Sequence, residues 1–138
     1  MADLGIAVRT YLLTKTAITD LVSQRFYADI LPQSATLPAI AYTRTSGFHD
    51  HILSDLAGLA HARIQFECFA DTRAVANSIV EAIRASGIIT QKGTISSVDI
   101  RGVRIEEGLR SELDYPHDGS DEHRYVASID LMFDFTET

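Results

Sequence analysis

Residues 59–87, LAHARIQFECFADTRAVANSIVEAIRASG, change their hydrophobic period at Asp71. Before Asp71, apolar residues occupy every second position, as in a β-strand with one face in the core and one face in water. The alternating apolar residues are Ile64, Phe66 and Cys68. After Asp71, apolar residues recur at the spacing of an amphipathic helix, which Asp71 can cap and Gly87 can end. We therefore predict a strand over 60–69 and a helix over 72–86.

On the N-terminal side of this segment, the pattern predicts two short helices and one strand. Residues 3–15 carry an apolar stripe at helical spacing, and TAITDLV, residues 16–22, carries a second one. A polar stretch with prolines follows, and AIAYTRTS, residues 39–46, then alternates weakly as a strand does. The connector GFHDHILSDLAG, residues 47–58, is bounded by glycines. We expect the two strands that it joins to form a long hairpin with this connector as its loop.

On the C-terminal side, the pattern predicts a second hairpin. The strand expected over 96–107 changes the parity of its apolar residues partway along. Its apolar residues are Val98 and Ile100 on one parity, then Val103 and Ile105 on the other. One extra residue restores a common face, so we predict a β-bulge near Gly102. Residues 124–135 alternate most regularly, and we expect them to pair with the preceding strand across an acidic loop, 108–122.

The predicted elements follow the order ααββαββ. Hairpins before and after the central helix favour an antiparallel sheet of about four strands with helices packed on one face, which is an α+β fold. The 138 residues suit a single domain, 1–138, that can bury a core. The apolar fraction of 46% is typical of a globular chain.

Composition disfavours several functional classes. No apolar run approaches the roughly 20 residues of a membrane helix, and the N-terminus lacks the basic cluster of a signal peptide, so we expect no membrane partner. The single cysteine, Cys68, excludes a disulfide framework and lies on the apolar parity of a strand, which predicts a buried thiol. A net charge of −7 disfavours general binding of nucleic acid. Most of that charge lies between Glu106 and Glu122.

GFHDH, residues 47–51, is the stretch that suggests metal chemistry. His49 and His51 would share one face of a strand, where two imidazoles can bind a metal. A catalytic zinc site needs a third protein ligand and groups that orient the ligands. The candidate third ligands are His61, His117 and His123, and nothing in the sequence places them together. Because His and Asp also collect in glycine-bounded turns, we interpret GFHDH as a hairpin tip and predict no bound metal.

Other motifs give no stronger case for catalysis. YPHDGSDEHRY, residues 115–125, contains two histidines and several acids, but PHDGSD is typical of turns and lacks the spacing of a calcium loop. The sequence contains no nucleophile elbow, phosphate-binding glycine loop or dinucleotide fingerprint. We therefore predict that the chain is not an enzyme and uses no cofactor. A small metal-dependent enzyme and a soluble ligand-binding module are the alternatives.

The segment 21–47, LVSQRFYADILPQSATLPAIAYTRTSG, resembles the opening of the tail completion proteins, or tail terminators, of long-tailed phages and prophages. The resemblance lies in a Leu-Val pair that ends a short helix, a basic-aromatic step, a Pro-Gln loop, and a proline that opens the first strand. In this chain these are Leu21-Val22, Arg25-Phe26-Tyr27, Pro32-Gln33 and Pro38. The later segments ARIQFECFADTRAVANSIVEAI and HRYVASIDLMFDF fit the same family, so the resemblance covers nearly the whole chain.

The resemblance implies a structural role in the virion, with a tail-terminator-like fold. Proteins of this family form a six-fold ring, a homohexamer, at the head-proximal end of the tail tube, where the ring stops tube growth and joins the tail to the head. The implied partners are further copies of the same chain, the tail tube protein, and the head connector or stopper protein. DNA would pass through the channel without specific binding. The implied location is the virion tail, with the host cytoplasm during assembly.

The two long hairpin loops, 47–58 and 108–122, are expected to reach neighbouring copies or partners, because their length exceeds what a tight hairpin needs. The residues expected to bind partners are Phe48, His49, His51, Arg110, Asp114, Tyr115 and His117.

Overall fold

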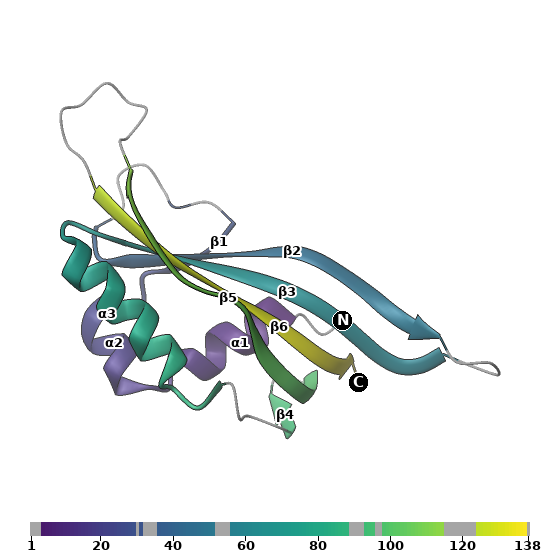
Figure 1. Ribbon diagram of the computed structural model, residues 1–138. Helices are drawn as coiled ribbons and strands as arrows, with labels where there is room; N and C mark the ends of the chain where they lie inside the picture. Colours follow the sequence, from purple (N-terminus) through teal and green to yellow (C-terminus); the bar gives the residue numbers. More distant parts are fainter. Residues whose placement is uncertain are drawn as a thin grey trace.

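The computed structural model describes the backbone of most of the chain (Figure 1). The described residues are 4–29, 31, 36–51, 56–88, 93–95, 98–114 and 124–137. Side chains are described for residues 4–29, 31, 36–44, 61–88, 93–95, 98–105 and 125–135.

The described part of the chain contains three helices and one six-stranded sheet. The helices are α1 (Leu4–Leu12), α2 (Thr16–Val22) and α3 (Arg73–Arg84). The strands are β1 (Phe26–Ala28), β2 (Ala39–His51), β3 (Leu56–Ala70), β4 (Gly93–Ile95), β5 (Val98–Asp114) and β6 (Arg124–Glu137). The sheet order is β1-β2-β3-β6-β5-β4, in which β1 and β2 are parallel and all other neighbours are antiparallel.

The predicted α+β class is confirmed, but the sheet is larger than predicted. The four long strands were expected, whereas β1 and β4 add one short strand at each edge, and the β1–β2 pair is parallel. Each of these two strands has three residues. A strand of that length is too short to show alternation, so the sequence pattern carried no signal for either.

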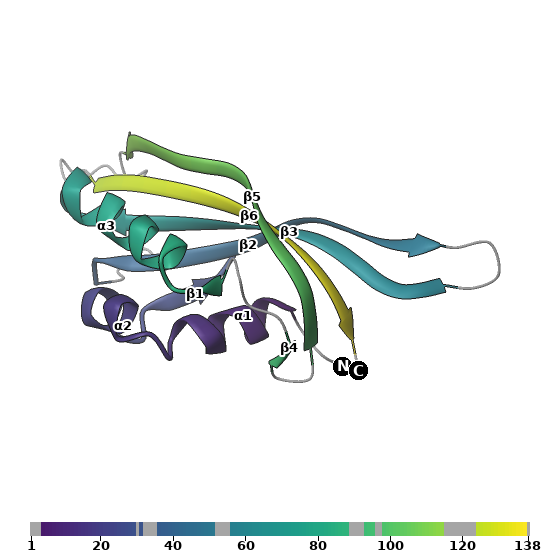
Figure 2. The ribbon, with the colours of Figure 1, turned by 60° about the horizontal axis from the view of Figure 1, so that its bottom comes forward.

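The described helices lie on one side of the sheet, as predicted (Figures 1 and 2). α3 packs against β3, β5 and β6, and α2 packs against α3 and β2. We call the side of the sheet that they cover the helix face and the opposite side the open face. None of the described helices is long and apolar enough to cross a membrane.

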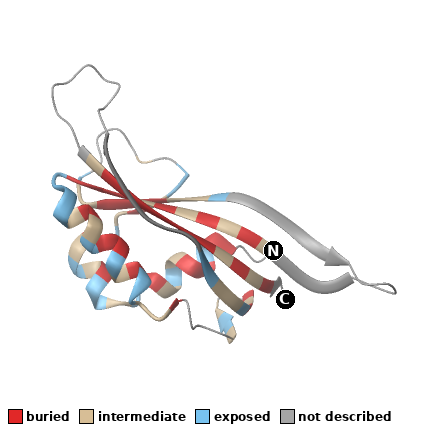
Figure 3. Ribbon diagram, in the orientation of Figure 1, coloured by how far each residue is buried: buried red, intermediate tan, exposed pale blue. Residues whose placement is uncertain are grey.

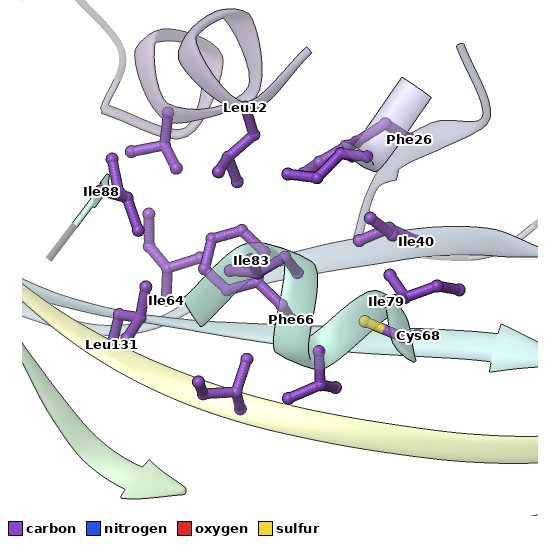
Figure 4. Close-up of a cluster of buried hydrophobic side chains, with 14 of the residues drawn as sticks. Leu12, Phe26, Ile40, Ile64, Phe66, Cys68, Ile79, Ile83, Ile88 and Leu131 are labelled. Atoms are coloured by element: carbon purple, nitrogen blue, oxygen red, sulfur yellow. The ribbon is translucent and has the colours of Figure 1, made fainter. Parts of the chain in front are cut away.

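Alternation along β3 separates the two faces. Its helix-face residues Ala62, Ile64, Phe66 and Cys68 are buried, and the buried thiol of Cys68 was predicted. Its open-face residues His61, Arg63, Gln65 and Glu67 are half-buried. The register with β6 continues the helix face through Ala127, Ile129, Leu131, Phe133 and Phe135, which are all buried. These side chains meet the apolar stripes of the helices in one core (Figures 3 and 4).

The N-cap of α3 lies one residue later in the chain than predicted. Thr72, not Asp71, occupies the N-cap position, and its hydroxyl accepts a hydrogen bond from the Val75 backbone N–H at 3.3 Å. Both residue types can cap a helix, so the sequence could not choose between adjacent candidates. The helix ends at Arg84, before the positive φ of 89° at Gly87.

The predicted β-bulge near Gly102 is confirmed. Ile100 pairs with Phe135 and Gly102 pairs with Asp134, so one extra residue, Arg101, lies in β5 at this point. The shift returns the later apolar residues to the helix face, with Val103 opposite Phe133 and Ile105 opposite Leu131. Two further register shifts follow along β5, whereas the β3–β6 pairing has none.

The two predicted loops are wrong over much of their length. β2 continues to His51 and β3 begins at Leu56, so residues 47–51 and 56–58 belong to strands, and residues 108–114 belong to β5. Backbone pairing does not require apolar alternation, and these segments have little of it, so the period gave no strand signal there. The remainder of both predicted loops lies outside the described residues.

Candidate assembly surface

The two long hairpins turn at opposite ends of the sheet. β3 and β6 are antiparallel neighbours, so the chain leaves β2 for β3 at one end and leaves β5 for β6 at the other. Figures 1 and 2 show the β2–β3 hairpin extending well beyond the helices, whereas the described strands of the β5–β6 hairpin end close to α3. The molecule therefore presents two distinct ends, which we call the β2–β3 end and the β5–β6 end.

The predicted partner-binding residues divide between these two ends. Phe48, His49 and His51 lie on β2 near the β2–β3 end. Arg110 and Asp114 lie on β5 near the β5–β6 end. Tyr115 and His117 lie outside the described residues. The five described residues therefore belong to strands near opposite ends of the sheet and do not form one site.

The metal hypothesis gains no third ligand from the neighbouring strand. His49 pairs with Ala60 and His51 pairs with Leu56, neither of which can bind a metal, and a register shift separates the two histidines. The candidate third ligand His61 instead contacts the Asp134 carboxylate. The other two candidates lie outside the described residues. Within the described residues, no three His, Cys, Asp or Glu side chains are grouped to hold a metal. That the chain needs no metal stays a prediction.

Cys68 is not available as a nucleophile in the folded chain. It lies on the helix face of β3 and is buried among apolar side chains (Figure 4). Burial raises the pKa of the Cys68 thiol well above its usual range, with a smaller contribution from the charge of Glu67. Because the thiolate is the reactive form, the structural role of this residue is that of a small core side chain.

Ion pairs across three strands occupy the centre of the open face. Arg63 on β3 donates from Nε and Nη2 to Oδ2 of Asp130 on β6, at 3.0 and 2.6 Å. Asp134 on β6 contacts His61 on β3 and accepts from Nη1 of Arg104 on β5 at 3.1 Å. The side chain of Asp130 is only 5% exposed. Asp130 thus joins β6 to β3, and Asp134 joins β6 to both β3 and β5.

Sequence reasoning missed these ion pairs. The basic residues fall on the polar parity of two predicted strands, 60–69 and 96–107, and the acids fall on the polar parity of a third, 124–135. The opposite charges were visible in the sequence. They predict ion pairs only if the strands that carry them are neighbours in a known register. Arg63 is 67 residues from Asp130 along the chain, and no local pattern fixes a register over that distance.

The sequence segment that carries the family resemblance has structural roles. Arg25 donates from Nε to the Pro38 carbonyl at 2.8 Å, which joins the end of α2 to the start of β2. The Phe26 ring lies 5.4 Å from the Tyr42 ring and 6.2 Å from the Phe66 ring, measured between centroids. The basic-aromatic step therefore fixes β1 against the sheet.

A short apolar cluster covers one end of the open face. Leu31 and Leu37, which precede β2, pack against open-face residues of three strands. Those residues are Ala41 on β2, Phe69 on β3 and Val126 on β6. The open face is thus covered toward the β5–β6 end and carries its charged residues in the middle.

Among the described strands, only two short ones pair with the outer sides of β2 and β5. β1 pairs with β2 at residues 40–42, and β4 pairs with β5 at residues 98–100. No described strand pairs with the outer side of β2 over 43–51, which we call the β2 edge, or with that of β5 over 105–114, the β5 edge. An open strand edge presents backbone donors and acceptors that a strand of another chain can pair with.

Comparison with known proteins places both the sequence and the fold. The sequence matches the family described as "Tail completion protein gp17" over residues 6–106. The structure is similar to a chain of "Virion of native gene transfer agent (GTA) particle", with a TM-score of 0.67 and 14% sequence identity. That similarity covers 96% of this chain and 94% of the other, and at this identity it shows a shared fold. No curated protein matches the sequence.

Proposed function

Because the chain belongs to the tail completion protein gp17 family, we propose that it is a non-enzymatic virion protein that caps the tail tube. In this proposal six copies form a ring at the head-proximal end of the tube. The ring stops tube growth and joins the tail to the head connector or stopper protein. The chain assembles in the host cytoplasm and stays in the finished tail.

The arrangement of the two hairpins is the observation that best supports this role. An adaptor between a tube and a connector needs two different binding surfaces that face in opposite directions. The β2–β3 end and the β5–β6 end lie at opposite ends of one sheet. A closed ring of such chains would present one set of hairpins on each of its two faces, because a cyclic ring repeats the same orientation in every subunit.

Different residues serve the two ring faces in this proposal. Phe48, His49 and His51 contact the partner at the β2–β3 end. The residues assigned to the partner at the β5–β6 end are Arg110, Asp114, Tyr115 and His117. The second set lies in or beside the most acidic segment of the chain. The two loop variants described below would show which end meets the tube and which end meets the connector.

The charge distribution supports a channel through which DNA passes without specific binding. The net charge of −7 opposes the phosphate backbone. On the open face, Arg63 and Arg104 are bound to Asp130 and Asp134, which leaves less positive charge available to phosphate. A metal-dependent enzyme or a soluble ligand-binding module has no comparable observation in its favour among the described residues.

Removing the gene from its phage or prophage tests the proposed function. Without the cap, we expect tail tubes of uncontrolled length and heads that lack tails, counted by electron microscopy. A plasmid copy of the wild-type chain should restore both tail length and infective titre. Normal tail lengths and normal joining in the absence of the gene would contradict the proposal.

Two variants assign the ring faces. The first replaces residues 115–123 by a two-residue Asn-Gly turn, which keeps β5 and β6 intact. The second replaces residues 52–55 in the same way at the other end. Because loop length changes stability only slowly, both chains should fold, as circular dichroism can check. We expect one variant to lose control of tail length and the other to lose joining to heads. Because both variants keep residues 48–51 and 110–114, wild-type titre with either one would show that the replaced turn itself contacts no partner.

A further inference from the structure

The direction of the long strands determines how neighbouring copies can meet. The four long strands β2, β3, β6 and β5 are neighbours in that order and alternate in direction. β2 and β5 are therefore antiparallel to each other, and they are the two outermost of the four long strands. In a ring whose axis runs roughly along the strands, β5 of one copy stands beside β2 of the next. The alternation then continues unbroken from copy to copy.

We propose that the β5 edge of each copy pairs with the β2 edge of the next copy, as antiparallel strands, to form the subunit contact of the ring. This inference rests on the ring of the proposed function. The partner of each edge is a second copy of this chain, and the two edges are different surfaces. Such a contact is head-to-tail and closes into a ring when the rotation between copies is constant.

Charge distinguishes this pairing from pairing of two identical edges. The β5 edge carries the acids Glu106, Glu107, Glu112 and Asp114 and one base, Arg110. The β2 edge carries Arg44, His49 and His51 and one acid, Asp50. Two β5 edges placed together would set acids against acids, and like charges on facing strands are destabilising. The β2 edge has only one acid, so a β5 edge placed against it avoids that repulsion.

The positions of β1 and β4 also fit a pairing of tilted strands. β1 leaves open the part of β2 that runs toward the β2–β3 end, and β4 leaves open the part of β5 that runs toward the β5–β6 end. When the copies stand level, the two open segments overlap only at their ends, near Thr43–Arg44 and Ile105–Glu107, so fuller pairing requires the strands to lean. Strands of a closed sheet are tilted and staggered for the same geometric reason.

Bulges make the two edges selective. Two of the register shifts in the pairing of β5 with β6 lie within the β5 edge, and both register shifts in the pairing of β2 with β3 lie within the β2 edge. Bulges twist an edge away from the flat form that pairs with any strand. A chain with such edges is protected from chance pairing and favours a partner of matching shape.

Paired cysteines test the contact. Ser46→Cys on the β2 edge is combined, in one chain, with a cysteine at a β5-edge position on the same face. The β5-edge substitutions are Glu107→Cys, Arg110→Cys and Glu112→Cys, which the register places on the open face with Ser46. The native thiol of Cys68 is buried and should not react. Cells assembling tails are treated with a short bismaleimide, and the products are separated on denaturing gels.

We expect at least one double variant to give a ladder that ends at a covalent hexamer. Mixing two single variants, one for each edge, should give only dimers, because each chain then has one reactive edge. The control Ser78→Cys, exposed on α3 away from both edges, should give no ladder. Dimers from a single variant alone would show pairing of identical edges and overturn the inference.

Electron microscopy of the same particles separates this inference from the proposed function. Rings at the tail end without cross-links in any double variant would overturn the edge contact and leave the capping role standing. Particles that carry only the wild-type chain serve as the reference. If these particles also show no ring at the tail end, and no double variant cross-links, the proposed function is overturned and the edge contact with it.

Discussion

The two faces of the sheet differ in the interactions that stabilise them. The helix face is a continuous apolar layer in which the side chains of Phe66, Phe133 and Phe135 are fully buried. The open face is held by ion pairs of the β6 aspartates, with the arginine side chains partly in water. Burying one large apolar side chain contributes ~1.5–3 kcal/mol, and the helix face buries many of them. A hydrogen bond to a charged group contributes ~1.5–3 kcal/mol, and the described open face has only a few. We conclude that the helix face supplies most of the stability.

Truncating Phe66 should give the largest loss of folding stability. Its ring is fully buried and meets the Phe26 ring edge to face, so Phe66→Ala removes apolar burial and leaves a cavity. We expect the free energy of unfolding to fall by about 3–5 kcal/mol, measured by urea denaturation. The control is Gln65→Ala, one residue away on the open face, which should change stability little. Equal losses in the two variants would refute the division between the faces.

Neutralising Asp130 should give a smaller loss on the open face. Asp130→Asn weakens the charge-assisted hydrogen bonds from Arg63, whose side chain is 34% exposed and can turn to water. We expect the free energy of unfolding to fall by about 2 kcal/mol. Combining this change with Arg63→Met in a double-mutant cycle should show coupling between the two positions. Additive losses would mean that the pair does not join β3 to β6.

Alkaline pH should weaken the helix face through Cys68. Its folded pKa is raised by burial, so at neutral pH both the folded and the unfolded chain carry the protonated thiol. As the pH rises past the ordinary thiol value, only the unfolded chain ionises. Stability should then fall by about 1.4 kcal/mol per pH unit from this group. Urea midpoints of wild type and Cys68→Ala between pH 7 and pH 10 measure the difference, and parallel slopes would contradict it.

Of the interactions that these variants alter, the ion pair between Arg84 and Glu81 on α3 should contribute least to folding stability. Both side chains are about half exposed and belong to neither face of the sheet. Glu81→Gln should leave the thermal midpoint within error of wild type, because surrounding water screens the pair. A clear drop would show that a surface ion pair matters as much as those on the open face.

The sequence predicted those parts of the fold that depend on the period of apolar residues. The strand–helix change at Asp71 and the bulge at Gly102 both follow from counting positions, since a displaced apolar residue would have to face water. The full lengths of β2 and β5 did not follow, because their outer halves pair through the backbone without apolar alternation. The contact of Arg63 with Asp130 depends on a register between distant strands, which no local pattern contains.

The candidate site was predicted less well than the fold. The residues chosen from the two hairpins were placed on loops, whereas five of them lie on strands at opposite ends of the sheet. The strand edges were missed because an edge is defined by where β1 and β4 stop, and both strands were invisible in the sequence. The family resemblance could supply the role in the tail, but the geometry of the contacts required the folded chain.

Locating the chain in finished particles tests the capping role most directly. Ser78→Cys on the exposed side of α3 can carry a maleimide-gold label, and labelled particles can be imaged by electron microscopy. We predict label at one place in each tail, the junction with the head, with the same position in tails detached from heads. Label spread along the tube, or gathered at the tip far from the head, would contradict the account.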